Sequence, residues 1–166
     1  MTAPQGLDPK EHEAWLTLLT VMELVPAVVD AQLRRDHGLT RFEYYVLSML
    51  SDCDCGTKPM TDLAVLTNGS LSRLSHAVRK LENRGWVAKQ ASQEDRRTTL
   101  VTLTDAGREQ WLRATPSHLE EVRRILFDVI PAEAVTALGD ILRPVADRAM
   151  AEGICPSSAN TSEPAA

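Results

Sequence analysis

Residues 70–104 read SLSRLSHAVRKLENRGWVAKQASQEDRRTTLVTLT, and this stretch decides the fold. In residues 70–84 the apolar side chains recur at steps of three, four and three, the spacing of one helix face. Gly85 follows where a helix C-terminal glycine is expected. Residues 86–91 and 98–103 are typical of strands, and the polar loop between them predicts a β-hairpin.

Upstream, residues 11–36 predict a long helix that is apolar on more than one side. Such a helix needs partners beyond one small core, which points to a second subunit. Pro26 should kink it, because proline removes a backbone donor.

Short elements are predicted between the long helix and residue 70. Thr40 with Glu43 three residues later is a capping-box pattern that begins a helix. Residues 52–59 have the Asp, Gly and Pro content of a loop. Thr61 can cap a short helix that ends at the turn signal of residues 68–69.

Helical spacing returns after the hairpin. We expect one helix over residues 104–114 and another over 117–130, with Pro116 at their join. A last helix starts at Pro131. The composition of residues 151–166 predicts a disordered tail.

Charge is distributed unevenly along the chain, whose net charge is -5. Residues 58–104 carry eight basic and four acidic side chains, a net charge of +4, whereas the remainder carries ten and nineteen, a net charge of -9. A basic middle between acidic ends is the electrostatic footprint of a nucleic-acid contact.

Several classes of protein are disfavoured by the sequence. Three cysteines, two of them one residue apart, are no disulfide framework, so a reducing compartment is expected. The apolar run of residues 16–29 is interrupted and falls short of a bilayer span, and residues 1–9 lack an export signal. We find no phosphate-binding glycine loop, metal pair or nucleophile motif. We therefore expect a cytoplasmic protein that is not an enzyme and has no cofactor, metal or membrane partner.

A short helix, a turn, a second helix with a polar face and a hairpin form the pattern of a winged helix-turn-helix, whose second helix enters the DNA major groove. Short serines and basic side chains on that helix suit contacts with phosphates and base edges. Arginines at the hairpin tip suit the minor groove, and a neighbouring carboxylate can hold a guanidinium in one direction. The candidate contacts with double-stranded DNA are Ser70, Ser72, Arg73, Ser75, His76, Arg79, Asp95, Arg96 and Arg97.

Over roughly residues 11–150 the sequence resembles the MarR family of bacterial transcription regulators. Residues 95–104 are similar to the family's D-x-R-x5-L-T signature, and Ala106 and Gly107 to the helix start after it. Residues 72–87 resemble the family's recognition helix and its exit.

The resemblance implies a mainly helical homodimer with small β-wings. Its terminal helices, in residues 11–37 and 105–150, would form the dimerisation region, and residues 38–104 the DNA-binding region, after a flexible N-terminus of residues 1–10. Each winged module would read half of a pseudo-palindrome. The family's motif implies that Arg97 rather than Arg96 enters the minor groove and that Asp95 orients it.

Two further features have open interpretations. Family members often bind a small aromatic or phenolic effector, and Trp15, Tyr44 and Tyr45 are candidates for its pocket, with core or interface packing as the alternative. Cys53 and Cys55, with Cys155 elsewhere, leave open a thiol-redox or metal-responsive regulator of the same fold. A dimeric interaction protein without DNA binding is the other alternative, although Arg73, Arg79, Asp95 and Arg97 are all present.

Overall fold

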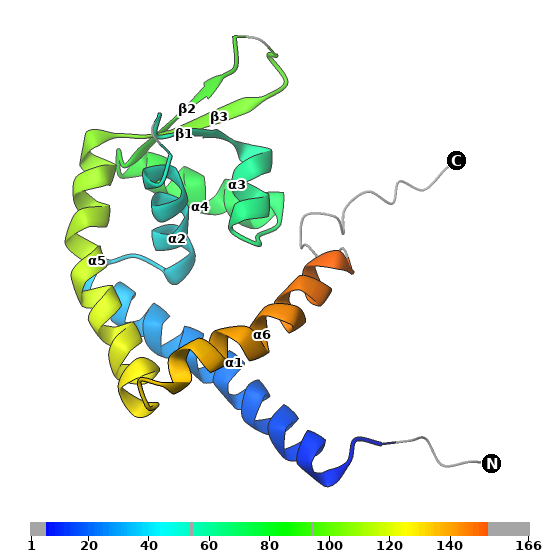
Figure 1. Cartoon of the computed structure of the whole chain (residues 1–166). Coiled ribbons are helices and arrows are strands. Elements are labelled where there is room, and N and C mark those ends of the chain that lie inside the picture. The colour runs from blue at the N-terminus through cyan, green and yellow to red at the C-terminus, as the bar shows by residue number, and fades with distance from the viewer. Residues whose placement is uncertain (1–5, 54, 94, 153–166) are drawn as a thin grey trace, which may run out of the picture.

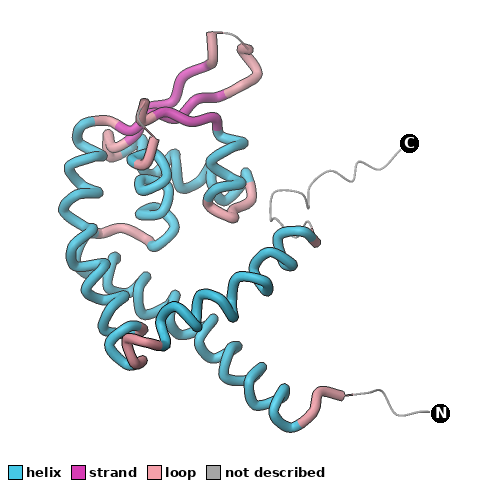
Figure 2. The backbone as a smooth tube through the Cα atoms, in the orientation of Figure 1, coloured by secondary structure: helices cyan, strands magenta, loops and turns pink. Residues whose placement is uncertain are grey.

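The computed structural model describes residues 6–53, 55–93 and 95–152, and it shows a mainly helical chain with a small sheet at one end (Figures 1 and 2). The elements are α1 (Pro9–His37), α2 (Arg41–Ser51), β1 (Thr57–Pro59), α3 (Met60–Leu66), α4 (Leu71–Asn83), β2 (Val87–Ala91), β3 (Thr99–Leu103), α5 (Asp105–Ile125), the 3-10 turn η1 (Phe127–Val129) and α6 (Ala134–Ala151). This is the predicted fold class. The segments predicted to be flexible or disordered, residues 1–10 and 151–166, lie largely outside the described residues, and so does Cys155. Helix α1 nevertheless begins at Pro9, within the N-terminal segment.

Local capping chemistry sets the bounds of the first two helices. Asp8 caps α1 in a reciprocal capping box with Glu11, and Gly38 ends the helix in the left-handed conformation at φ 65°. The predicted capping box of α2 is confirmed, since Thr40 Oγ1 accepts from the Glu43 N–H at 3.0 Å and Glu43 accepts from the Thr40 N–H at 2.8 Å.

The apolar part of α1 is longer than the sequence interpretation allowed. An 18-residue window of this helix has a mean hydropathy of 1.6, so its length and composition would allow it to cross a membrane. The same properties suit a helix that packs against protein. The residues of α1 that are fully buried within this chain, Val29, Gln32 and Leu33, lie toward its C-terminal end.

The hydrophobic core lies between α2, α3, α4 and the sheet. Its largest fully buried side chains include Leu47, Leu50, Leu63, Leu74, Val78, Leu81 and Val101. The predicted apolar stripe of α4 is therefore buried, except that Leu71, at its first turn, is 44% exposed. Leu33 and Leu39 extend this core to the end of α1 and the connection that follows.

The sheet has the order β1-β3-β2, and both pairs are antiparallel. The hairpin of β2 and β3 is confirmed with strand bounds within one residue of those expected. The prediction that residues 52–59 are all loop is wrong, because Thr57 pairs with Thr102 and begins β1. Three residues are too few to show an alternating pattern, and their pairing partner is distant in sequence.

Three predicted helix boundaries are wrong. Pro116 does not separate two helices but lies inside α5, which stays continuous and packs along α1. Beside it, the Thr115 and Ser117 hydroxyls donate to the carbonyls of Trp111 and Ala114 at 2.8 and 3.3 Å.

At the other two boundaries the residue expected, Thr61 in one case and Pro131 in the other, does not begin the helix. Pro59, extended at ψ 147°, precedes α3, whereas Thr61 lies within the helix and donates to Asp62. Pro131 forms a turn in which its carbonyl accepts from the Ala134 N–H at 2.8 Å, and α6 begins only at Ala134.

The corner between the wing and α5 explains the end of the D-x-R-x5-L-T stretch. Thr104 Oγ1 accepts from the Gly107 N–H at 3.0 Å, which caps α5, and donates to the Gly85 carbonyl at 2.7 Å. A Cβ at Gly107 would lie 1.9 Å from the Trp86 carbonyl oxygen. Only glycine allows this close approach, which locks α5 against the exit of α4.

Candidate nucleic-acid interface

Helix α4 divides into a buried face and a polar face. Leu74, Ala77, Val78 and Leu81 are buried, whereas Ser72, Ser75, His76 and Arg79 are exposed at the spacing of one helix face. This is the face that the sequence predicts for base contacts. Ser70 has a different position, because its Oγ accepts from the Arg73 N–H at 3.2 Å and caps the helix.

Arg73 and His76 also face a second surface. The Arg73 guanidinium lies 4.2 Å from the centre of the Phe42 ring, and His76 Nδ1 lies 3.0 Å from an Arg79 guanidinium nitrogen. Both side chains line a cavity of about 450 Å³ between α4, α2 and α1. Asp30, Arg34, Arg41, Glu43 and Lys80 also line it, so the cavity carries charges of both signs.

The turn between α3 and α4 fixes the position of Phe42. Asn68 adopts φ 47°, and a Cβ at Gly69 would lie 2.6 Å from Phe42 Cζ. The predicted Asn68-Gly69 turn is therefore confirmed. Its glycine leaves space for the ring on which the Arg73 guanidinium rests.

Some of the basic residues counted in the middle of the chain have internal partners. Arg84 donates to the Gly38 carbonyl at 2.8 Å and lies over the Trp86 ring at 4.9 Å. Lys89 forms a 2.9 Å ion pair with Glu82, which joins β2 to α4. The number of basic residues therefore overstates how many of their side chains are free to reach DNA.

In the wing, Asp95 acts on the backbone. Its Oδ1 accepts from the Arg97 N–H at 2.9 Å, and its Oδ2 accepts from the Thr98 hydroxyl at 3.1 Å. Among the described residues, no ion pair joins Asp95 to an arginine guanidinium. Asp95 thus shapes the turn that presents Arg96 and Arg97, which are both exposed. The sequence predicts that the Asp95 carboxylate contacts an arginine guanidinium directly, whereas in the structure it contacts the Arg97 backbone N–H.

The three aromatic candidates for an effector pocket do not meet within one chain. Tyr44 is buried, with its hydroxyl 3.2 Å from Thr115 Oγ1 and its ring 4.4 Å from that of His118, and Tyr45 is half-buried. Trp15 is 46% exposed near the other end of α1. At a rise of 1.5 Å per residue, Trp15 lies about 25 Å along α1 from Gln32, a residue at which α1 contacts α5.

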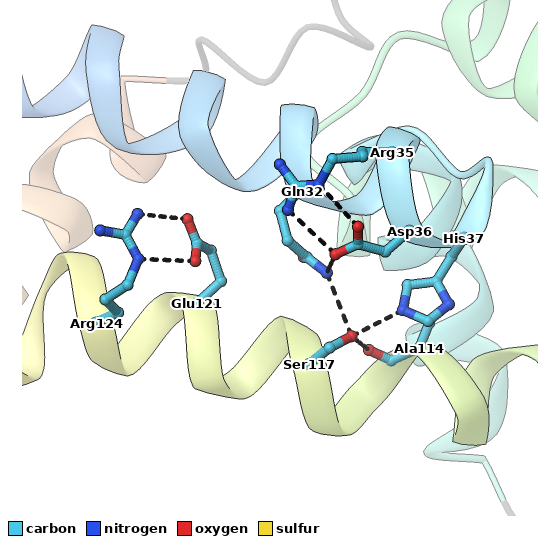
Figure 3. A network of polar contacts seen from close by, with 8 residues as sticks. All are labelled: Gln32, Arg35, Asp36, His37, Ala114, Ser117, Glu121 and Arg124. Atoms are coloured by element: carbon cyan, nitrogen blue, oxygen red, sulfur yellow. Dashed lines mark hydrogen bonds and ion pairs between the residues drawn. The ribbon is translucent and has the colours of Figure 1, made fainter.

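A polar junction between α1 and α5 was missed by the sequence analysis (Figure 3). Gln32, only 3% exposed, donates to Asp36 at 3.0 Å and to Ser117 at 3.2 Å, and Ser117 Oγ lies 2.7 Å from His37 Nε2. Hydrogen bonds to the Asp36 carboxylate, chiefly from Arg35 and secondly from Gln32, lower the pKa of Asp36. Periodicity contains no signal for this site, because polar residues on an inward face look like interruptions of an apolar stripe.

A helix-turn-helix whose apolar face is buried, followed by a hairpin with exposed arginines at its tip, defines the class of winged helix-turn-helix DNA-binding proteins. Residues 30–112 match the family described as transcriptional regulator SarA/Rot. The chain is 34% identical to Sco3205, a MarR family transcriptional regulator from Streptomyces coelicolor solved in complex with DNA, with a TM-score of 0.83 and coverage of 89% of this chain and 92% of that chain.

Two other relatives agree. AbsC, a MarR family transcriptional regulator from Streptomyces coelicolor, is 33% identical, with a TM-score of 0.83 and coverage of 89% of this chain and 99% of that chain. The uncharacterized HTH-type transcriptional regulator YdgJ of Bacillus subtilis (strain 168) is 26% identical over 125 residues, 75% of this chain and 74% of YdgJ. The chain belongs to the MarR family of winged helix-turn-helix transcription regulators.

Proposed function

We propose that this transcription regulator works in the cytoplasm as a ligand-responsive repressor that binds a pseudo-palindromic operator as a homodimer. The observation that carries the proposal is the exposed face of Ser72, Ser75 and Arg79, fixed on a buried core beside the arginines of the wing. Because helix α4 and the strands of the wing share one hydrophobic core, both suit contact with a single duplex.

The proposed major-groove contacts come from α4. Serine side chains are short enough to let the helix approach the base edges, and Arg79 can donate two hydrogen bonds to a guanine. The helix N-terminus near Ser70 attracts a phosphate, because its first backbone N–H groups are not all used within the helix.

The proposed minor-groove contact comes from Arg97. The narrow minor groove has an enhanced negative potential that attracts a guanidinium. Asp95 supports this role by fixing the Arg97 backbone, which leaves the side chain available at the wing tip. Arg96 lies beside it and suits a phosphate contact.

The apolar surface of the terminal helices supports the homodimer. Helix α6 has no buried residue, and Ile141, Val145 and Met150 are more than half exposed. An apolar hollow of about 770 Å³ runs between α1, the end of α5 and α6, lined by residues such as Leu18, Val21, Leu126 and Leu142. A surface of this kind suits a self-complementary interface, so we assign residues 11–37 and 105–150 to dimerisation and residues 38–104 to DNA binding.

The effector part of the proposal rests on the cavity beside α4. Arg73 and His76 belong both to this cavity and to the proposed DNA-contacting helix. A small aromatic or phenolic molecule bound there would change the position of α4 or compete for Arg73, and DNA affinity would fall through the differential binding of the two states.

The test is selection of bound fragments from the source genome, followed by titration of the selected duplex. We expect one shared pseudo-palindromic sequence with half-sites about one helical turn, roughly 34 Å, apart. Arg79→Ala should reduce the preference for that sequence by about 1–3 kcal/mol. Enrichment of no common sequence, together with equal affinity for scrambled DNA, would contradict operator recognition.

A further inference from the structure

Two thiols meet in the connection between α2 and β1. Cys53 Sγ and Cys55 Sγ lie 2.9 Å apart, and both cysteines are free. Cys55 is exposed and Cys53 is half-buried, so a small solute can reach the pair. Neither residue belongs to the surfaces proposed for DNA binding or dimerisation.

Hydrogen bonds hold the backbone that follows the pair. The Gly56 N–H donates to the Cys53 carbonyl at 2.8 Å, and the Gly56 carbonyl accepts from the Leu103 N–H of β3 at 2.8 Å. Thr57 Oγ1 lies 2.9 Å from Thr102 Oγ1, also on β3. Gly56 adopts φ 61°, which side chains rarely allow. The turn thus keeps the two sulfur atoms together.

Hydrogen bonds also direct both sulfurs to one place. Cys55 Sγ and Cys53 Sγ lie 3.3 and 3.7 Å from the Thr57 carbonyl oxygen, which can accept the proton of either thiol. Hydrogen bonding from Cys55, with a smaller contribution from the Lys58 charge, lowers the pKa of the Cys53 thiol. A larger thiolate fraction makes Cys53 the more nucleophilic member of the pair.

We propose that Cys53 and Cys55 form a reversible dithiol–disulfide site that a hydroperoxide oxidises. The Cys53 thiolate attacks a peroxide oxygen, the O–O bond breaks, and the products are a Cys53 sulfenic acid and an alcohol, or water when the oxidant is hydrogen peroxide. Cys55 Sγ then attacks Cys53 Sγ, the S–O bond breaks, the S–S bond forms, and water leaves. In sum, two thiols give two electrons and their two protons to one hydroperoxide.

The geometry favours this second step over other fates of the sulfenic acid. The sulfurs must approach by only about 0.9 Å to reach the S–S bond length of about 2.05 Å. An internal thiol held this close acts at a high effective concentration and outcompetes thiols in solution. Among the described residues, no third Cys, His, Asp or Glu joins the pair to complete a metal site.

The experiment uses the full chain with Cys155→Ser, which removes the third thiol, and one equivalent of hydrogen peroxide in the absence of DNA. After acid quenching and alkylation, trypsin places both cysteines on one peptide, residues 42–73, because Lys58 precedes Pro59. We expect this peptide to lose two hydrogen atoms and both alkylation sites, and to regain both sites after treatment with dithiothreitol.

Single variants test the order of the steps. Cys55→Ser should accumulate a Cys53 sulfenic acid that a 1,3-diketone traps, whereas Cys53→Ser should label much less. Matching melting temperatures show that both variants are folded. Full alkylation of Cys53 and Cys55 after prolonged peroxide treatment would overturn the proposal, as would a disulfide found only between chains. Neither result depends on the regulator binding DNA.

Discussion

The guanidinium of Arg73 lies 4.2 Å over the centre of the Phe42 ring, so helix α2 positions a side chain of the proposed recognition helix. Such a cation–π contact is worth about 0.5–1 kcal/mol at an exposed site. It restrains the Arg73 side chain before DNA binds, so the side chain loses less conformational freedom on DNA binding. The same contact places Arg73 at the rim of the cavity between α4 and α1. A single residue therefore connects the proposed effector cavity to the DNA surface.

We predict that Arg73 supplies discrimination between sequences. Arg73→Ala should cost about 1–3 kcal/mol on the preferred operator and much less on a scrambled duplex, because alanine cannot donate to a base edge. Arg73→Lys is the matched control, since it keeps the charge but not the bidentate donor. Titration of both variants against both duplexes checks this. Equal losses on the two duplexes would show that Arg73 is a phosphate anchor.

For the wing, we predict a loss of affinity that does not depend on sequence. Arg97→Ala should weaken binding to all duplexes and flatten the salt dependence by about one unit for each phosphate that the variant no longer neutralises. The measurement is the slope of log affinity against log salt concentration.

The variant Asp95→Ala distinguishes two effects of this carboxylate in the wing, its negative charge and its support of the turn. Removing a carboxylate should by itself strengthen binding to a polyanion, yet the variant also loses the hydrogen bonds to the Arg97 N–H and the Thr98 hydroxyl. We expect weaker binding, because the turn that presents Arg97 loosens. Tighter binding of Asp95→Ala in a duplex titration would contradict the positioning role.

The exposed apolar face of α6 predicts an interface that a single charge disrupts. Ile141 is 68% exposed in the single chain, so Ile141→Glu should leave the monomer fold intact but shift the protein from dimer to monomer. Burying an unpaired carboxylate is costly. Analytical ultracentrifugation at micromolar concentration measures this, with Thr136→Glu on the polar face of α6 as the control. A wild-type monomer under these conditions would exclude the dimer.

In reducing buffer, the double variant Cys53→Ser, Cys55→Ser should bind DNA as the wild type does. The two residues lie beside β1, which pairs with β3 on the edge opposite β2, and neither is on α4. Affinity for the selected operator, measured with dithiothreitol present, checks this expectation. A lower affinity of the reduced double variant would mean that this turn supports the wing.

Acid should destabilise the protein through His118. Burial lowers the pKa of His118 from its ordinary value of 6.5, so the folded state holds the imidazole neutral at a pH where the unfolded chain binds a proton. The free energy of unfolding therefore falls as the pH drops from 6.5 through the lower pKa of the folded state. Urea unfolding at a series of pH values and fixed protein concentration measures this slope.

His118→Gln should flatten the pH dependence in that window, and His12→Gln, which removes an exposed histidine, is the matched control. Equal slopes in wild type and His118→Gln would assign the acid sensitivity to other groups.

Local patterns predicted most elements of this protein. The capping box of Thr40 and Glu43, the turn at Asn68-Gly69 and the hairpin after Gly85 each depend on residues close in sequence, so their chemistry can be read from the chain. The fold class and the family followed from the same local patterns. The roles of individual DNA-contacting residues stay predictions.

Contacts between distant segments decided the rest. Strand β1 exists because Thr57 pairs with Thr102, and α5 continues through Pro116 while it packs along α1. The support of Arg73 by Phe42 and the thiol contact of Cys53 with Cys55 also require a defined backbone geometry. The sequence by itself determined most of the helices, the wing and the class of protein, because capping, turns and periodicity act over a few residues. Only the tertiary structure decided which polar side chains meet, because that depends on how separate elements pack.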